Sequence, residues 1–350
     1  MKKAAVAHIP EAGQVTLKST LVEAPGPGQV LLQALFSSLS PGTERALMAG
    51  HILPLPQNLG YSLVARVIDI GEGVEHLQQG DTVVATAAHA EFQVIDARTL
   101  TPVPVGTDLE QSAFFNLAHT AMYAIRRSGL QLGEPCVVLG QGLVGAITAQ
   151  LARLAGAVPV IVTDIDDTRL AASRAMGVQH AINPLHDPDG VKEALKAEGL
   201  DGVAVVFEAT GARAPLEQAL DLVAERGRVV IMSQSGDGQL PKFADKLMFK
   251  GVSLIGGYIN SKPFALYRSD LQITESWPPV MRTGLQRYGH SDCWTSDEDI
   301  RVFLRLVKSG RLDLRPLISH RLHWQQLPDA YQMVWDRDPA LLGGLIHWQD

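Results

Sequence analysis

Residues 136–145 read CVVLGQGLVG, a short apolar run that leads directly into a glycine-rich turn. The apolar run, Cys136 to Leu139, is typical of a buried strand. Apolar residues then recur every three or four positions from Ala146 to Ala155, which predicts a helix. A strand, a G-x-G-x-x-G turn and a helix in this order match the fingerprint of dinucleotide-binding domains.

Each glycine of this turn has a physical role in the fingerprint. Gly140 permits the tight turn, Gly142 lets the backbone approach a pyrophosphate, and Gly145 allows the helix to pack closely on the strand. Unpaired N–H groups and the helix dipole at the start of the helix favour negative charge. The turn therefore predicts a site for the phosphates of a dinucleotide.

An acidic residue ends the next apolar strand. Val158 to Val162 is followed by Asp164, which lies 164 − 145 = 19 residues after the last glycine. About 20 residues is the spacing of the acid that binds the adenosine ribose. A carboxylate at this position would repel a 2′-phosphate, so we expect NAD rather than NADP. The alternative is that Asp164 only caps a turn in the acidic loop 164–167.

Composition excludes several classes of function. The chain has 350 residues and a net charge of −7, without basic blocks, which argues against nucleic-acid binding. No run approaches the roughly 20 apolar residues of a membrane span, and the N-terminus lacks the apolar region of a secretory signal. Of the two cysteines, Cys136 falls in a predicted buried strand, so we expect no disulfide and a cytoplasmic location.

The rest of the chain divides by its periodicity. Residues 1–115 contain short strands separated by Gly and Pro turns, which predicts a barrel-like β domain. Alternating strands and helices over 116–259 predict a doubly wound parallel sheet with helices on both faces. The apolar C-terminal segment, 260–350, is expected to pack back onto the β domain. The strands expected in the parallel sheet are 136–139, 158–163, 180–182, 203–208, 228–232 and 252–256.

Several ordered motifs resemble the medium-chain dehydrogenase/reductase superfamily, of the zinc alcohol dehydrogenase and sorbitol dehydrogenase type. They are Ser40-Pro-Gly-Thr-Glu44, Leu59-Gly-Tyr-Ser62, Gly80-Asp-Thr-Val83 and Val206-Phe-Glu-Ala-Thr-Gly211. The resemblance implies an α/β fold in which a Rossmann NAD-binding domain, 116–259, joins a GroES-like β-barrel catalytic domain built from 1–115 and 260–350. It also implies a small-molecule substrate and a homodimer or homotetramer.

The resemblance extends the set of expected cofactor-binding residues. Gln141, Leu143 and Val144 lie in the pyrophosphate loop, and Arg169 matches a basic residue that helps to hold the adenosine ribose. Arg169 is otherwise a surface charge on a helix. The carboxyl ends of the fourth and fifth strands of the sheet are where ligands bind in open α/β folds. The residues expected there are Thr210, Gly211 and Ser233.

The zinc ligands of the family are not matched. The positions of its cysteine, histidine and third ligand are Pro41, Tyr61 and Asn116, and Ser62 replaces the neighbouring glutamate. A catalytic zinc needs thiolate, imidazole or carboxylate ligands. The four-cysteine lobe is also missing from residues 85–95. The sequence therefore predicts that the protein binds no zinc at either position.

Without a metal, a hydrogen-bond donor or acid/base group must handle the substrate proton. Thr43 matches the family's relay hydroxyl, Tyr61 replaces a ligand imidazole, and His119 is placed on the loop that enters the cofactor domain. Glu44 is expected to orient one of these. The alternatives are that Thr43 caps the following helix, Tyr61 packs in the core and His119 is structural.

These observations predict a zinc-independent NAD(H)-dependent oxidoreductase. The expected reaction interconverts a secondary alcohol and its ketone, on a sugar, a polyol or a cyclic hydroxyl compound. Two alternatives stay open. One is an NADPH-dependent enoyl or quinone reductase, against which Asp164 argues. The other is an NAD-binding protein without catalytic activity.

Overall fold

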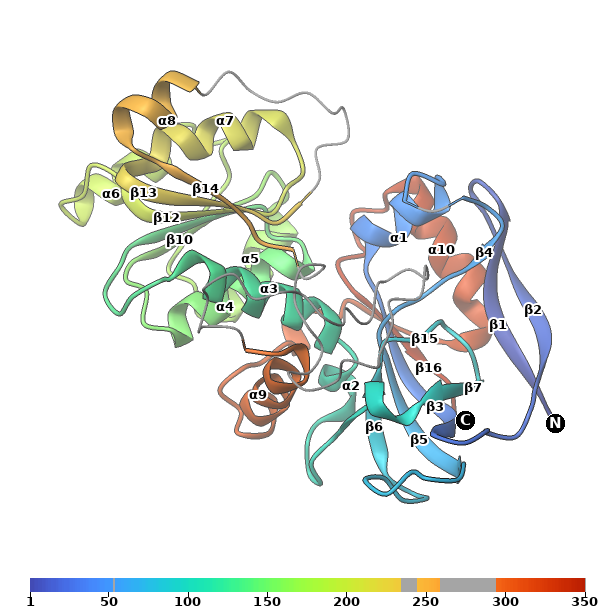
Figure 1. The fold of residues 1–350 in the computed structure, drawn as a ribbon. Helices are drawn as coiled ribbons and strands as arrows, with labels where there is room; N and C mark the ends of the chain where they lie inside the picture. The colour runs from blue at the N-terminus through green and yellow to red at the C-terminus, as the bar shows by residue number, and fades with distance from the viewer. Residues whose placement is uncertain (53, 234–243, 259–293, 350) are drawn as a thin grey trace. The chain divides into compact units, whose positions relative to one another are not determined.

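The computed structural model describes residues 1–52, 54–233, 244–258 and 294–349. The chain forms two compact units (Figure 1). The first unit comprises Met1–Asn116, Asn260–Arg311 and Ile318–Asp350, and the second comprises Leu117–Ile259 and Leu312–Leu317. Most of the aromatic stretch 262–296 lies outside the described residues. No described helix is long and apolar enough to cross a membrane.

The second unit is built on a parallel sheet of six strands in the order β11-β10-β9-β12-β13-β14. The chain enters this sheet in its middle, at β9, and winds outward first to one edge and then to the other. This confirms the doubly wound α/β architecture. The strands are β9 (Cys136–Leu139), β10 (Val160–Thr163), β11 (His180–Ile182), β12 (Val203–Glu208), β13 (Val223–Ile231) and β14 (Ser253–Gly256).

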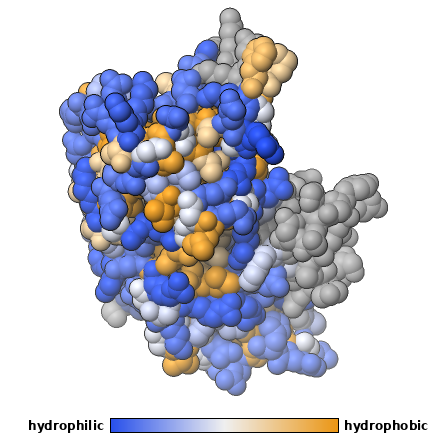
Figure 2. Space-filling model, turned by 90° about the vertical axis from the view of Figure 1, so that its left-hand side faces the viewer, coloured by the Kyte–Doolittle hydropathy of each residue, from blue (hydrophilic) through white to orange (hydrophobic). Residues whose placement is uncertain are grey.

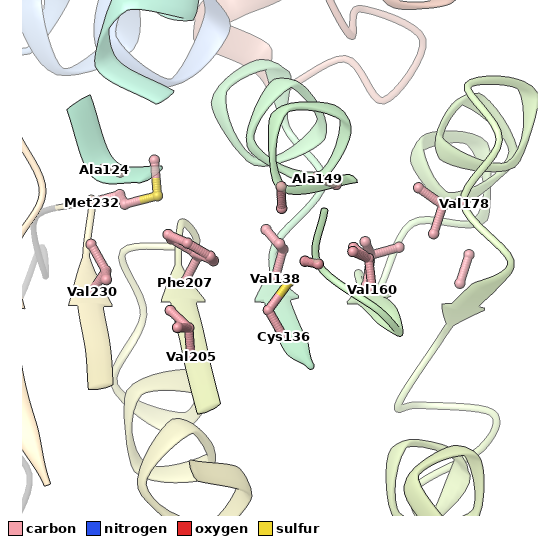
Figure 3. Packing of buried hydrophobic residues seen from close by; sticks show 14 of the residues in the cluster. Ala124, Cys136, Val138, Ala149, Val160, Val178, Val205, Phe207, Val230 and Met232 are labelled. Atoms are coloured by element: carbon pink, nitrogen blue, oxygen red, sulfur yellow. The ribbon is translucent and has the colours of Figure 1, made fainter. Parts of the chain in front are cut away.

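Helices cover both faces of the parallel sheet. Successive residues of a strand point to opposite sides, and because the central strands carry apolar residues on both sides, both faces must be covered. Val138 and Phe207 face one apolar layer, in which Ala149 points toward Val138 (Figure 3). Their neighbours Val137 and Val206 face the other layer. The helices are α3 (Phe115–Ser128), α4 (Leu143–Leu154), α5 (Asp167–Ala175), α6 (Gly190–Ala197), α7 (Arg213–Leu222) and α8 (Ala244–Lys250).

The cysteine of β9 belongs to this core rather than to a reactive site. Cys136 is fully buried, and burial is the main reason that the pKa of its thiol is raised to about 12. A thiol in this state is neither a nucleophile nor a metal ligand. Outside the core, the face of the molecule in Figure 2 is mainly hydrophilic, with apolar patches between the polar residues.

The first unit contains the two sheets of a GroES-like β domain, in which the strands pair antiparallel except for β15 and β16, which pair parallel. One sheet follows the path β15-β16-β3-β5-β6-β8, with β7 paired to β3, and a second has the order β2-β1-β4. β16 pairs antiparallel with β3, so the C-terminal end of the chain joins the N-terminal sheet, as expected. The strands are β1 (Lys2–Glu11), β2 (Gln14–Val22), β3 (Gln29–Leu39), β4 (Gln57–Asn58), β5 (Leu63–Ile70), β6 (Thr82–Ala85), β7 (Phe92–Asp96), β8 (Thr101–Pro102), β15 (His320–His323) and β16 (Gly344–His347).

Some elements differ from the sequence-based expectation. β2 was not predicted, because it is an edge strand with largely exposed residues and therefore has no apolar run. In the C-terminal segment, Arg315–Leu317 forms a 3₁₀ turn, and β15 begins at His320. Leu312–Leu317 also joins the second unit, whereas the sequence placed it in the catalytic domain. The remaining helices are α1 (Pro41–Met48), α2 (Leu109–Ser112), α9 (Ser296–Lys308) and α10 (Leu327–Asp336).

Candidate functional site

The expected cofactor residues meet at one edge of the parallel sheet. Gly140, Asp164, Thr210 and Ser233 follow the carboxyl ends of β9, β10, β12 and β13. β9 and β12 are neighbours, and the connections that leave them run toward opposite sides of the sheet (Figure 1). Such a switch point is where open α/β sheets bind their ligands.

The three glycines differ in what surrounds them. Gly140 has φ +90°, and a Cβ there would lie 2.8 Å from Thr210 Cγ2. A Cβ at Gly145 would overlap the carbonyl oxygen of Gly140. In contrast, nothing lies within 4 Å of the position that a Cβ on Gly142 would take. Gly140 and Gly145 therefore allow close packing, whereas Gly142 leaves open space at the start of α4.

The start of α4 has the properties of an anion site. Gly142 is the residue that precedes the helix, and it has no side chain that could cap the first N–H groups. These groups and the dipole of a 12-residue helix favour phosphate oxygens. The residues present here therefore fit the pyrophosphate of a dinucleotide.

The other residues of the turn contribute only backbone groups to that site. Gln141 is fully buried; its Nε2 donates to the carbonyl of Gly140 at 2.8 Å, and its Oε1 accepts from Ser173 Oγ at 2.8 Å. Leu143 is buried and Val144 packs against the core. The side chains of Gln141, Leu143 and Val144 therefore pack beneath the turn and stabilise it, which the sequence pattern did not indicate.

Asp164 ties the glycine turn to the end of β10. Its Oδ2 accepts the backbone N–H of Gln141 at 2.6 Å, and its Oδ1 accepts that of Asp166 at 2.9 Å. Arg169 Nη1 lies 3.7 Å from Oδ2. The bond from the N–H of Asp166 closes a local turn, which is the alternative role considered for Asp164. The residue that caps α5, however, is Asp166. A carboxylate has further lone pairs, so these bonds leave room for ribose hydroxyls.

A buried glutamate that is absent from the residues expected at this site organises the ends of β12 and β13. Glu208 Oε1 accepts from Thr210 Oγ1, Thr210 N (2.7 Å) and Gly211 N (3.2 Å). Its Oε2 accepts from Ser233 Oγ at 2.7 Å. Glu208 is 2% exposed. In the sequence, the signal for this role is an acidic residue at the end of an apolar strand, just before small polar residues.

The candidate proton-handling residues lie in different units. Thr43, Glu44 and Tyr61 are in the first unit, and His119 is in the second. Thr43 is half-buried in the first turn of α1, and the capping position is Ser40, so the alternative role of Thr43 as a helix cap is wrong. Tyr61 is 5% exposed. His119 is buried within α3, not on a loop as expected.

The positions that correspond to zinc ligands are used for other purposes. Pro41 begins α1 and has no ligating side-chain atom. Asn116 Nδ2 donates to the carbonyl of Tyr61 at 2.9 Å, and Ser62 Oγ donates to the carbonyl of Ala113 at 2.6 Å. Across the described ranges, no group of three or more His, Cys, Asp or Glu side chains could hold a metal ion. These residues do not fit a catalytic zinc.

Comparison with known proteins agrees with this fold. A family model for zinc-binding dehydrogenases matches residues 144–276. The chain is 29% identical over 330 residues to a 2-dehydro-3-deoxy-L-galactonate 5-dehydrogenase of Pseudoalteromonas atlantica, with 85% of each chain covered. It is 25% identical over 350 residues to an L-threonine 3-dehydrogenase of Pyrococcus horikoshii, with 89% of this chain and 90% of the relative covered.

A solved alcohol dehydrogenase of E. coli CFT073, in complex with NADH, has the same fold with a TM-score of 0.79. The two share 16% identity, and the match covers 99% of this chain and 100% of the other. The chain is thus similar to zinc-type medium-chain alcohol and sugar dehydrogenases, in sequence over part of its length and in fold over nearly all of it.

Proposed function

We propose that this protein is a zinc-independent, NAD(H)-dependent oxidoreductase that interconverts a secondary alcohol and its ketone. The observation that carries the proposal is the open space at Gly142 at the start of α4, beside the carboxylate of Asp164. The proposal keeps the expected small-molecule substrate, homodimeric or homotetrameric assembly and cytoplasmic location.

The chain supplies the binding groups for the dinucleotide. The backbone at Gly142 and the first N–H groups of α4 would hold the pyrophosphate, and Asp164 with Arg169 would hold the adenosine ribose. Thr210, Gly211 and Ser233, which Glu208 fixes, would line the remaining part of the site. When bound, the nicotinamide exchanges a hydride with the carbon atom of the substrate.

The proton of the substrate hydroxyl is left to side chains of this chain. We assign it to Thr43, Tyr61 or His119, because a developing alkoxide needs a donor when no metal is present. Tyr61 interacts electrostatically with Tyr331, whose pKa is raised well above its usual value, first by burial and then by Glu44. Tyr331 therefore stays protonated and continues to donate to Glu44.

The substrate class is supported by the relatives. Their names denote dehydrogenases of a sugar acid and of threonine. Both substrates present a secondary alcohol with polar groups next to it. We therefore favour polyols, sugars and other polar secondary alcohols over enones.

Turnover on a panel of compounds tests this function. We expect reduction of NAD with at least one polyol, sugar or hydroxy acid, and activity that survives EDTA, because the residues at the ligand positions do not fit zinc. Absorbance at 340 nm measures turnover, and X-ray fluorescence measures metal content. Stoichiometric zinc, or activity only on enones with NADPH, would contradict the proposal. Dinucleotide binding without any turnover would favour the non-catalytic alternative.

Replacing Asp164 tests the choice of cofactor. Asp164→Asn removes the charge that would bind the ribose and repel a 2′-phosphate, so we expect the ratio of NADH to NADPH affinity to fall about tenfold or more. Fluorescence titration with both cofactors measures this ratio. Asp167→Asn is the matched control, since it removes a charge from the same loop at an exposed position. Equal ratios in the two variants would show that Asp164 does not select the cofactor.

A further inference from the structure

Five polar side chains, buried to 3% exposure or less, meet in the first unit although they are far apart in the sequence. They come from β3, α1, the connection between β6 and β7, α10 and the end of the chain after β16. We call this set the His89 network. Its members are Ser37, Glu44, His89, Tyr331 and Trp348.

Hydrogen bonds at one end of the network are compatible with a proton on Nε2 of His89. The indole of Trp348 can only donate, and its Nε1 lies 2.9 Å from Ser37 Oγ, so Ser37 accepts this bond. Ser37 Oγ lies 2.7 Å from His89 Nδ1, and Ser37 can donate its own proton to that nitrogen. In this assignment the proton of the His89 ring is on Nε2.

At the other end, the Nε2 of His89 faces a buried carboxylate. Glu44 Oε1 lies 3.6 Å from His89 Nε2, and Glu44 Oε2 accepts from the hydroxyl of Tyr331 at 2.9 Å. Glu44 Oε1 and His89 Nε2 make no hydrogen bond within the part of the chain that the structure describes. Leaving such groups incompletely paired in the core is unfavourable, and more so for a charge. Packing alone does not account for a carboxylate here.

The network also contacts the segments that carry the proposed proton-handling residues. Glu44 directly follows Thr43 in the first turn of α1. Gly60, which directly precedes Tyr61, packs on His89: a Cβ there would lie 2.6 Å from His89 Cγ. Tyr61 in turn acts on Tyr331 through the electrostatic interaction described above.

We propose that Glu44 and His89 form a buried positioning pair, which holds Thr43 and Tyr61 in place for transfer of the substrate proton. This inference rests on the proposed function. In it, the charge of Glu44 orients the Tyr331 hydroxyl on one side and the His89 Nε2–H on the other. Neither member of the pair contacts substrate; each acts through the segment that it holds.

Kinetics of Glu44→Gln tests the pair. The amide keeps the shape of the side chain and can still accept from Tyr331, but it lacks the charge. We expect kcat to fall about tenfold or more, while KM for the dinucleotide changes less than about twofold, because the glycine turn belongs to the other unit. Glu44→Asp restores the charge and should recover part of kcat. Glu110→Gln is the control, since this partly exposed carboxylate pairs with Arg321; we expect kcat within about twofold of wild type.

A second measurement does not depend on turnover. Nitrogen-15 NMR of the histidine rings in the wild-type protein should show His89 protonated on Nε2, and the difference spectrum with His89→Gln assigns its signals among the 11 histidines. Glu44→Gln should shift the Nε2 signal more than the Nδ1 signal. A ring protonated only on Nδ1, or a folded Glu44→Gln protein with wild-type kcat, would overturn the pair. If the wild type turns over no substrate, the proposed function fails. The protonation site of the His89 ring in the wild-type protein then remains as the test of whether Glu44 and His89 form a pair.

Discussion

Gly145→Ala is expected to lower both the stability of the protein and its affinity for the dinucleotide. The added Cβ would overlap the carbonyl oxygen of Gly140, which is backbone and cannot rotate away. Moving α4 away from β9 disturbs the core that Ala149 and Val138 share. Overpacking of this kind costs about 1–3 kcal/mol, and more where backbone must shift. We expect dinucleotide affinity to fall about a hundredfold or more, as measured by fluorescence titration, with a lower midpoint in thermal unfolding.

Gly142→Ala is the matched variant. Its Cβ would meet no atom of the protein and its φ of −65° suits alanine, so we expect an unchanged unfolding midpoint. The methyl group nevertheless enters the space assigned to the pyrophosphate, and affinity should fall about tenfold or more. If Gly142→Ala binds the dinucleotide as tightly as the wild type, the phosphates do not lie at this turn. If Gly145→Ala is as stable as the wild type, the close packing inferred at Gly145 is wrong.

Glu208→Ala is expected to have the second large effect. The substitution leaves the donors from Thr210, Gly211 and Ser233 without their common acceptor. Lost bonds to a buried charged acceptor cost about 1.5–3 kcal/mol each before relaxation, so we expect a loss of stability of about 3 kcal/mol or more. The turn after β12 then loses its fixed conformation, and KM for the dinucleotide should rise about tenfold or more. Denaturant unfolding and steady-state kinetics measure the two effects.

The control for Glu208 is another glutamate of the same unit. Glu134 pairs with Arg228 at 2.6 Å before the start of β9 and is partly exposed, so Glu134→Gln should cost less than about 1 kcal/mol and leave KM unchanged. Glu208→Gln separates charge from shape, since the amide keeps one acceptor oxygen. A Glu208→Gln protein with wild-type stability and KM would show that the carboxylate is not needed at this edge of the sheet.

Local signals explain why so much of the second unit was predictable. Each central strand is a short apolar run, and glycines or acidic residues stand where it ends, so strand positions and the doubly wound order follow from the chain alone. Signals were weaker in the first unit, where β2 alternates exposed and half-buried residues. His119 lies in a helix rather than on a loop because α3 begins at Phe115, and the residue directly before it, Phe114, is not of a type that marks a helix start.

The sequence by itself determined the parallel sheet, the glycine turn at its switch point and the position of Asp164, because spacing along the chain specifies these features. Only the tertiary structure decided that Gln141 points inward, that Glu208 joins two strand ends and that Ser37, Glu44, His89, Tyr331 and Trp348 share one buried network. Burial and the direction of a hydrogen bond depend on which distant segments pack together. No pattern within one segment contains that information.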